Sequence, residues 1–124
     1  LVDFRFQKEI SDIGAMNLIS TNGASDFWIY NEKIFDINEI DLTNFNVSLF
    51  INNEIQETGN TKNVLNNPLN AVLWLINTLS LKGEAMLKGQ YISSGSCTKA
   101  FKIHSGNLIK ADFGKLGKIE FEYI

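Results

Sequence analysis

The chain has 124 residues, a length that fits one domain and suffices to bury a hydrophobic core without disulfides. Its 44% hydrophobic and 20% charged residues are ordinary for a soluble globular protein, and its net charge of −3 argues against electrostatic binding to nucleic acid. The single cysteine, Cys97, cannot form an internal disulfide, and the longest apolar stretch, 69–81, is too short and too polar to span a bilayer. We therefore expect a soluble, cytoplasmic protein.

The first thirty residues predict a short strand, a weak helix, a turn and a second strand. The segment "LVDFRF" (1–6) alternates apolar and charged residues as a strand does, and apolar residues recur in 7–17 at a loose helical spacing. "STNGAS" (20–25) has the composition of a turn. "DFWIY" (26–30) is rich in strand-forming residues and predicts a buried strand.

The segment 44–60, "NFNVSLFINNEIQETGN", predicts a β-hairpin. Polar and apolar residues alternate along its first arm, and Asn52-Asn53 stands where the turn belongs. Near the C-terminus, "NLIKADF" (107–113) and "KIEFEYI" (118–124) predict two further strands joined by a glycine-rich turn.

The segment 67–83 predicts the one long helix. Asn67 is suited to the N-cap, Pro68 to the first helical position and Gly83 to the C-terminal cap. The apolar stripe expected to face the core consists of Leu69, Val72, Leu73, Ile76 and Leu79, widened by Trp74 and Leu75. After it we expect a turn at Lys88-Gly89 and a strand over 91–95, so the fold class is mostly β (α+β) in a single domain, 1–124.

A small polar stretch, 94–98 ("SGSCT"), is the most chemically suggestive part of the sequence. Its backbone N–H groups and hydroxyls could hold a carboxylate, whereas a plain turn would explain the same composition. Cys97 could serve as a nucleophile only if His104, the sole histidine, reached it, and a lone cysteine is more often a buried filler. The sequence holds no histidine pair and no acidic loop with calcium spacing.

Five motifs in order give the C-terminal sixty residues a family resemblance. They are Asn67-Pro68-Leu69-Asn70, Leu87-Lys88-Gly89-Gln90, Ser94-Gly95-Ser96, Gly106-Asn107 and Ala111-Asp112-Phe113-Gly114-Lys115-Leu116-Gly117. This series resembles the C-terminal half of the 2-hydroxypentadienoate (2-keto-4-pentenoate) hydratases and oxalocrotonate decarboxylases, in the fumarylacetoacetate hydrolase superfamily. The segments 1–6 and 21–31 resemble the family's preceding strand and serine loop more loosely.

The resemblance implies a mixed β-sheet roll with one packed helix, and a chain that is the C-terminal segment of a larger catalytic domain. It implies a lyase that adds water to a 2-hydroxy-2,4-dienoate to give a 4-hydroxy-2-oxo acid. The alternatives are a 2-oxo-3-enedioate decarboxylase, an acylpyruvate hydrolase of the same superfamily, or a non-catalytic remnant of the fold. Expected partners are the small 2-oxo or 2-hydroxy acid, the N-terminal half and further copies of the chain.

The resemblance also implies a set of site residues. The family holds Mg²⁺ or Mn²⁺ with a Glu-x-Glu pair in its N-terminal half and a third carboxylate, which would fall just before Leu1, so no metal ligand is expected within the chain. Ser25 matches a serine of the catalytic cavity, and Asn22 stands in the adjoining substrate-binding stretch. Gly95, Ser96 and Thr98 match the loop that receives the carboxylate end of the substrate.

Overall fold

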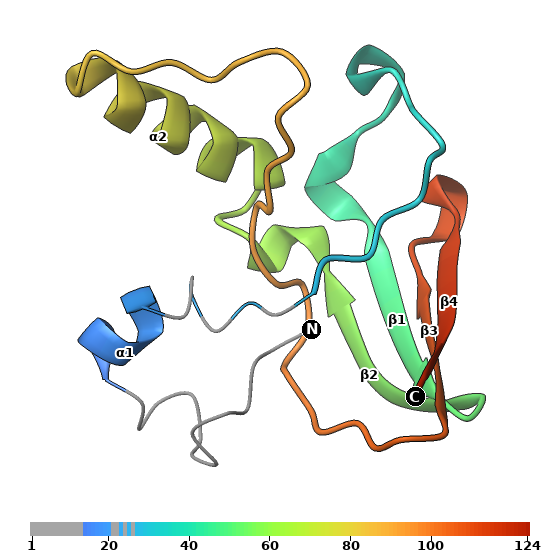
Figure 1. The fold of residues 1–124 in the computed structure, drawn as a ribbon. Helices are drawn as coiled ribbons and strands as arrows, with labels where there is room; N and C mark the ends of the chain where they lie inside the picture. The colour runs from blue at the N-terminus through green and yellow to red at the C-terminus, as the bar shows by residue number, and fades with distance from the viewer. Residues whose placement is uncertain (1–13, 21–22, 24, 26) are drawn as a thin grey trace. The chain divides into compact units, whose positions relative to one another are not determined.

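A computed structural model describes residues 14–20, 23, 25 and 27–124 of the chain (Figure 1). It consists of two compact units, residues 1–31 and 32–124, which are considered separately below. The strand predicted at 1–6 lies outside the described residues. None of the helices in the described part is long and apolar enough to cross a membrane.

Of the helix predicted over 7–17, the structure describes only 14–17, and residues 7–13 lie outside the described part of the chain. Helix α1 spans Ala15–Ser20 and begins directly after Gly14, whose φ is +78°. The N–H of Leu18 donates to the Gly14 carbonyl at 3.0 Å, which closes the first turn. Because Gly14 lies in the left-handed region, a right-handed helix cannot run through it, and the predicted helix over 7–17 is wrong at that point.

The buried strand predicted over 26–30 is also wrong for the residues that are described. Residues 27–30 form no strand, and their side chains are exposed. The rings of Trp28 and Tyr30 stack with their centroids 5.2 Å apart. Strand preference is realised only through pairing and burial against neighbours, so aromatic composition alone does not fix a strand.

The second unit contains a four-stranded antiparallel sheet in the order β2-β1-β3-β4 (Figure 1). Its strands are β1 (Asn46–Ile51), β2 (Glu54–Asn60), β3 (Asn107–Asp112) and β4 (Lys118–Tyr123). Both predicted hairpins are confirmed, with a shift of register between Leu49 and Phe50. Short 3₁₀ helices lie at Ile37–Glu39 (η2), Leu42–Asn44 (η3), Thr61–Asn63 (η4) and Gly114–Leu116 (η5).

The Asn52-Asn53 turn does more than reverse the chain. Both residues have positive φ, 50° and 67°, which a two-residue hairpin loop with the favoured twist requires and which asparagine tolerates. The Asn52 N–H donates to the Leu108 carbonyl at 2.9 Å, and its side-chain oxygen accepts from the Leu108 N–H at 2.9 Å. Asn52 thereby extends the β1–β3 pairing into the turn.

The long helix α2 (Pro68–Leu81) has the ends that the sequence predicted. The Asn67 side chain accepts from the Leu69 N–H at 3.0 Å, and Pro68 opens the helix. At the other end Gly83 has a φ of +74°, and its N–H donates to the Ser80 carbonyl at 3.0 Å. The turn at 88–89 follows as expected, whereas residues 91–95 do not form the predicted strand.

The predicted burial of the apolar stripe on α2 is wrong. Leu73 is 57% exposed and Trp74 66%, and Leu69 and Ile76 are also exposed, whereas Val72, Leu75 and Leu79 are half-buried. Among the described residues, the buried apolar side chains are Val47 of β1, Ile109 of β3 and Val64, which follows η4. On α2 only Pro68, at the start of the helix, is buried. The α+β class is confirmed, and in the second unit, taken by itself, much of the apolar surface of α2 is exposed.

Candidate substrate-binding loop

Residues 94–98, called here the Gly-Ser loop, pass across the end of the sheet in the second unit. Gly95 has a φ of +133°, where a side chain would be strained. A Cβ atom built on Gly95 would lie 3.1 Å from Cγ1 of Val64, one of the buried core residues. The loop backbone therefore lies directly on the core, as close as glycine allows.

Gly59 of β2 makes the second close approach. A Cβ atom on Gly59 would collide with the Cys97 carbonyl oxygen and lie 2.7 Å from its carbonyl carbon, and it would lie 2.9 Å from Cγ2 of Thr98. The glycine thus opens the space through which the Gly-Ser loop passes over the strand. A glycine inside a strand pattern is a known mark of close backbone approach, so the sequence carried a signal for Gly59 that we did not use.

Asn63 of η4 holds the loop by a hydrogen bond. Its side-chain amide donates to the Cys97 carbonyl at 2.8 Å across 34 positions of sequence. Asn63 is positioned by η4, which begins after its N-cap Asn60. Two hydrogen bonds hold Thr61 of η4 to Phe45: the Thr61 N–H donates to the Phe45 carbonyl at 2.9 Å, and the Phe45 N–H donates to the Thr61 hydroxyl at 2.8 Å. No sequence motif pointed to Asn63, because its partner is a distant backbone carbonyl.

The polar groups of the loop face solvent. Gly95 and Ser96 are exposed and Thr98 is half-buried. Among the described residues, the Asn63 bond is the one hydrogen bond that reaches 94–98, so the hydroxyls of Ser96 and Thr98 and the adjacent N–H groups are not used within this part of the chain. Such a set of donors on a fixed backbone suits an anionic oxygen.

Cys97 has no feature of a nucleophile. Its thiol is half-buried, and burial raises the pKa of the Cys97 thiol above its ordinary value, which keeps it protonated at neutral pH. The segment from Cys97 to His104 does not form the hairpin that could have joined the two, and His104 is exposed. The structure therefore favours the role of a packed filler whose carbonyl anchors the loop.

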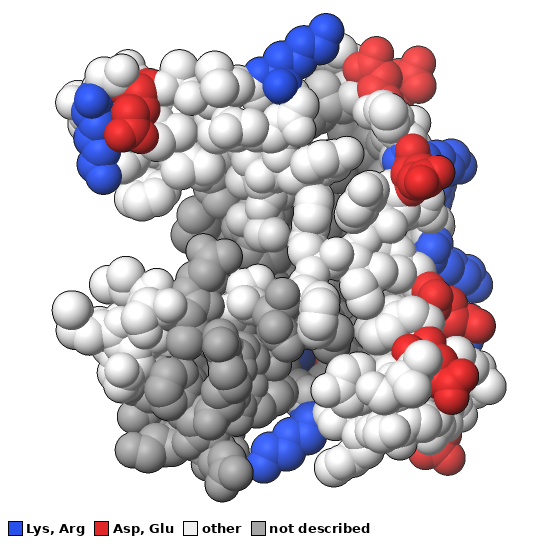
Figure 2. All heavy atoms as spheres, in the orientation of Figure 1, with Lys and Arg blue, Asp and Glu red and all other residues white. Residues whose placement is uncertain are grey.

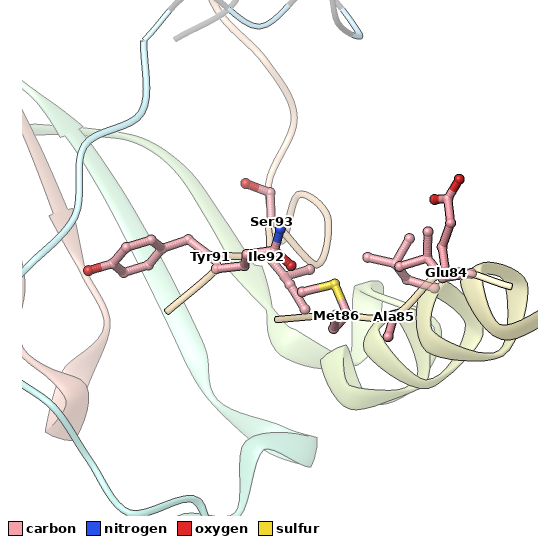
Figure 3. Close-up of a pocket in the computed structure, with 9 residues that line it drawn as sticks. Glu84, Ala85, Met86, Tyr91, Ile92 and Ser93 are labelled. Carbon is pink, nitrogen blue, oxygen red and sulfur yellow. The ribbon is translucent and has the colours of Figure 1, made fainter. Parts of the chain in front are cut away.

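An open groove of about 500 Å³ lies next to the C-terminal half of α2 (Figure 3). Its walls come from the helix and from the returning segment 84–93: Leu75, Leu79, Glu84, Ala85, Met86, Gln90, Tyr91, Ile92 and Ser93. Met86 and Ile92 lie beside the helix, while the ring of Tyr91 extends away from it (Figure 3). None of the predicted substrate-binding residues lines this groove, so it is distinct from the Gly-Ser loop.

The remaining predicted residues belong to the first unit. Ser25 is exposed, and Asn22 lies outside the described residues. In the described part of the chain, no three His, Cys, Asp or Glu side chains gather closely enough to hold a metal ion. The described residues therefore do not by themselves form a divalent-cation site.

Comparisons with other proteins connect this loop and sheet to known enzymes. No protein-family model matches the chain. It is 32% identical over 106 residues to a 2-oxo-hept-4-ene-1,7-dioate hydratase of Escherichia coli, covering 86% of this chain and 40% of the relative. It is 26% identical over 124 residues to a 4-oxalocrotonate decarboxylase of Pseudomonas putida, covering 46% of it. A 2-keto-4-pentenoate hydratase 1 of Dechloromonas aromatica is 24% identical over 96% of this chain and 44% of its own length.

Solved structures that resemble this chain belong to the same group of enzymes. Two structures of 4-oxalocrotonate decarboxylase from Pseudomonas putida G7 match 88% of this chain with a TM-score of 0.81 and 28% identity, and the match covers 42% and 41% of their chains. One is complexed with calcium and acetate, the other with magnesium and adipate. The chain thus spans less than half the length of the relatives it matches, and corresponds to their C-terminal half.

Proposed function

We propose that this chain is the C-terminal part of a hydratase, because it is similar to 2-oxo-hept-4-ene-1,7-dioate and 2-keto-4-pentenoate hydratases and to 4-oxalocrotonate decarboxylases. The complete enzyme would add water to a 2-hydroxy-2,4-dienoate and give a 4-hydroxy-2-oxo acid. The observation that carries this proposal is the 32% identity to a hydratase over 106 residues, which are 86% of this chain. The fold supports it, because the same architecture is found in an enzyme of the family.

In this proposal the Gly-Ser loop binds the carboxylate end of the substrate. Ser96 and Thr98 would donate their hydroxyl hydrogens, and the exposed backbone N–H groups would complete the site. Asn63 and Gly59 support the proposal because they fix the loop backbone against the sheet, so that its donors are held in place before substrate arrives. Ser25 is proposed as a catalytic residue and Asn22 as a substrate-binding residue, on the resemblance of their stretch of sequence to the family's serine loop.

A divalent cation, Mg²⁺ or Mn²⁺, is proposed for the complete enzyme. The support is that related structures are complexed with calcium or magnesium. Its ligands are proposed to be carboxylates outside this chain, as the family resemblance implies. Such an ion would act as a Lewis acid toward the 2-oxo acid, and the residues of this chain would bind and orient the substrate beside it.

Decarboxylation of a 2-oxo-3-enedioate is the second candidate, favoured by the structural match to 4-oxalocrotonate decarboxylase. The two activities are separated by their products. Hydration removes the conjugated diene without loss of carbon, whereas decarboxylation releases CO₂. The complete protein that contains this chain should consume a 2-hydroxy-2,4-dienoate, measured by ultraviolet absorbance, without releasing CO₂ from an enedioate.

The same assay tests the cation. Excess chelator should abolish turnover, and Mg²⁺ or Mn²⁺ should restore it. Undiminished turnover in chelator would remove the cation from the proposal, and absence of both activities in the metal-loaded polypeptide would favour a non-catalytic remnant.

Ser96→Ala tests the binding loop in the same polypeptide. Loss of a hydrogen bond to a charged oxygen is worth about 1.5–3 kcal/mol, so KM should rise roughly tenfold or more while the fold is unchanged. Ser105→Ala, at an exposed serine in a turn outside the loop, is the matched control. Equal KM values for the two variants would exclude Ser96 from the site.

A further inference from the structure

Residues 65 and 66, which connect η4 to α2, have an unusual backbone conformation. Leu65 has a φ of +50° and Asn66 a φ of +64°. Asparagine tolerates this left-handed region, but a bulky leucine there is an outlier. If the chain needed only to turn from η4 into α2, glycine or asparagine at both positions would make the same bend with less strain. The bend alone therefore does not explain the leucine.

Hydrogen bonds hold the backbone at Leu65 in this conformation. The side-chain amide of Asn70 donates to the Leu65 carbonyl at 2.8 Å. The N–H of the next residue, Asn66, donates to the Lys62 carbonyl at 3.0 Å. A strained residue persists only where its surroundings fix it in this way, and such residues cluster at active sites and at sites that clamp a ligand. The strain at Leu65 therefore suggests a role in binding.

Leu65 directly follows two residues that contact the Gly-Ser loop. Asn63 donates to the Cys97 carbonyl at 2.8 Å. A Cβ atom on Gly95 would lie 3.1 Å from Cγ1 of Val64. Since one trans peptide joins Val64 to Leu65, their Cα atoms are about 3.8 Å apart. The strained leucine therefore stands beside the loop that is proposed to hold the carboxylate end of the substrate.

The Leu65 side chain contributes little to the packing of the second unit. It is 61% exposed, whereas the preceding Val64 is 5% exposed. Figure 2 shows charged side chains along the outer side of the sheet and at the far end of α2, whereas the surface around the start of α2 is uncharged. Binding sites for small molecules combine apolar walls with a few polar groups that fix the orientation of the ligand. An exposed leucine beside a loop of hydrogen-bond donors provides that combination.

We propose that Leu65 forms an apolar wall of the substrate site and packs against the carbon chain of the substrate, while the Gly-Ser loop holds a carboxylate. The inference rests on the proposed function for the nature of the substrate. The positive φ of Leu65 is tolerated because it places a leucine, rather than a glycine, at this position beside the loop.

Leu65→Gly in the complete protein separates this role from a structural one. Because glycine adopts positive φ freely, the unfolding midpoint in urea should stay near the wild-type value or rise. Loss of the apolar contact should raise KM for a 2-hydroxy-2,4-dienoate about tenfold, with kcat little changed. Leu65→Met, which keeps an apolar side chain of similar volume, should restore most of the affinity.

Asn66→Gly is the matched control, because it places glycine at the adjacent positive φ and leaves the leucine unchanged. Its KM should equal that of the wild type. Equal KM values for the two glycine variants would show that Leu65 does not contact the substrate. An unfolding midpoint for Leu65→Gly well below that of Asn66→Gly would show that the leucine packs against protein instead. Either result would overturn the proposal.

Titration calorimetry with adipate, which a related structure holds together with magnesium, provides a readout independent of turnover. In the magnesium-loaded complete protein, Leu65→Gly should bind adipate about tenfold more weakly than the wild type. This weakening in a protein without either activity would refute the proposed function alone. Turnover with KM and adipate affinity unchanged in Leu65→Gly would refute this inference alone, and a wild-type protein with neither turnover nor adipate binding would refute both.

Discussion

Replacement of Gly59 by alanine tests how tightly the Gly-Ser loop is held against β2. The added Cβ would collide with the Cys97 carbonyl oxygen and lie 2.7 Å and 2.9 Å from two further atoms of Cys97 and Thr98. Two of these three atoms are backbone, so the loop or the strand must move. Overpacking of this kind costs about 1–3 kcal/mol of unfolding free energy. With a urea m-value of about 1–3 kcal/mol/M, the unfolding midpoint should fall by roughly 1 M.

A second readout shows whether the loop is what moves. Cys97 is the only cysteine, so the rate at which a thiol reagent labels the native protein reports on the loop alone. Displacement of the loop should expose the half-buried thiol and lower its raised pKa, and both changes accelerate labelling.

Gly106→Ala is the control for Gly59→Ala. A Cβ on Gly106 meets nothing within 4 Å, but the residue has a φ of +83°, so the variant should lose about 1–2 kcal/mol from backbone strain without changing the labelling of Cys97. If Gly59→Ala were as stable as the wild type and were labelled at the same rate, the close approach of the loop to β2 would be refuted.

Three further changes test other contacts of the second unit. Asn63→Ala should lose about 1 kcal/mol of unfolding free energy, because the Cys97 carbonyl loses its donor, and thiol labelling should accelerate; an unchanged rate would contradict the anchoring role. Asn67→Ala should cost about 1 kcal/mol in urea unfolding through loss of the N-cap of α2, whereas Asn67→Ser should stay near the wild type. The hydrogen bond from Lys118, 3.0 Å from the Asp112 carboxylate, is the main cause that lowers the pKa of Asp112. The folded state therefore favours the carboxylate, so its contribution to stability is present above the ordinary aspartate pKa of about 4 and is lost as pH falls below that value. Asp112→Asn should flatten thermal stability between about pH 5 and pH 2, and a curve parallel to that of the wild type would contradict this.

The local chemistry of the sequence determined the elements whose signals are self-contained. Asn52-Asn53 predicted a hairpin turn because asparagine tolerates positive φ, and both residues adopt it. Asn67 and Pro68 fixed the start of α2 because an N-cap acceptor and a proline at the first position act within one turn. The ordered motifs of the last sixty residues likewise carry the resemblance to the hydratases and decarboxylases, since each motif is a short stretch of chain.

Tertiary structure alone decided which surfaces are covered and which groups meet. The periodicity of α2 marked an apolar face, but whether Leu73 is buried depends on what packs there, and within this chain it is 57% exposed. Residues 27–30, three of them aromatic, predicted a strand, but a strand also requires a pairing partner, which composition does not supply. Asn63 reaches the Cys97 carbonyl across 34 positions, because η4 and the Gly-Ser loop meet at the end of the sheet. Contacts of this kind depend on the path of the whole backbone, and no local pattern of residue types encodes them.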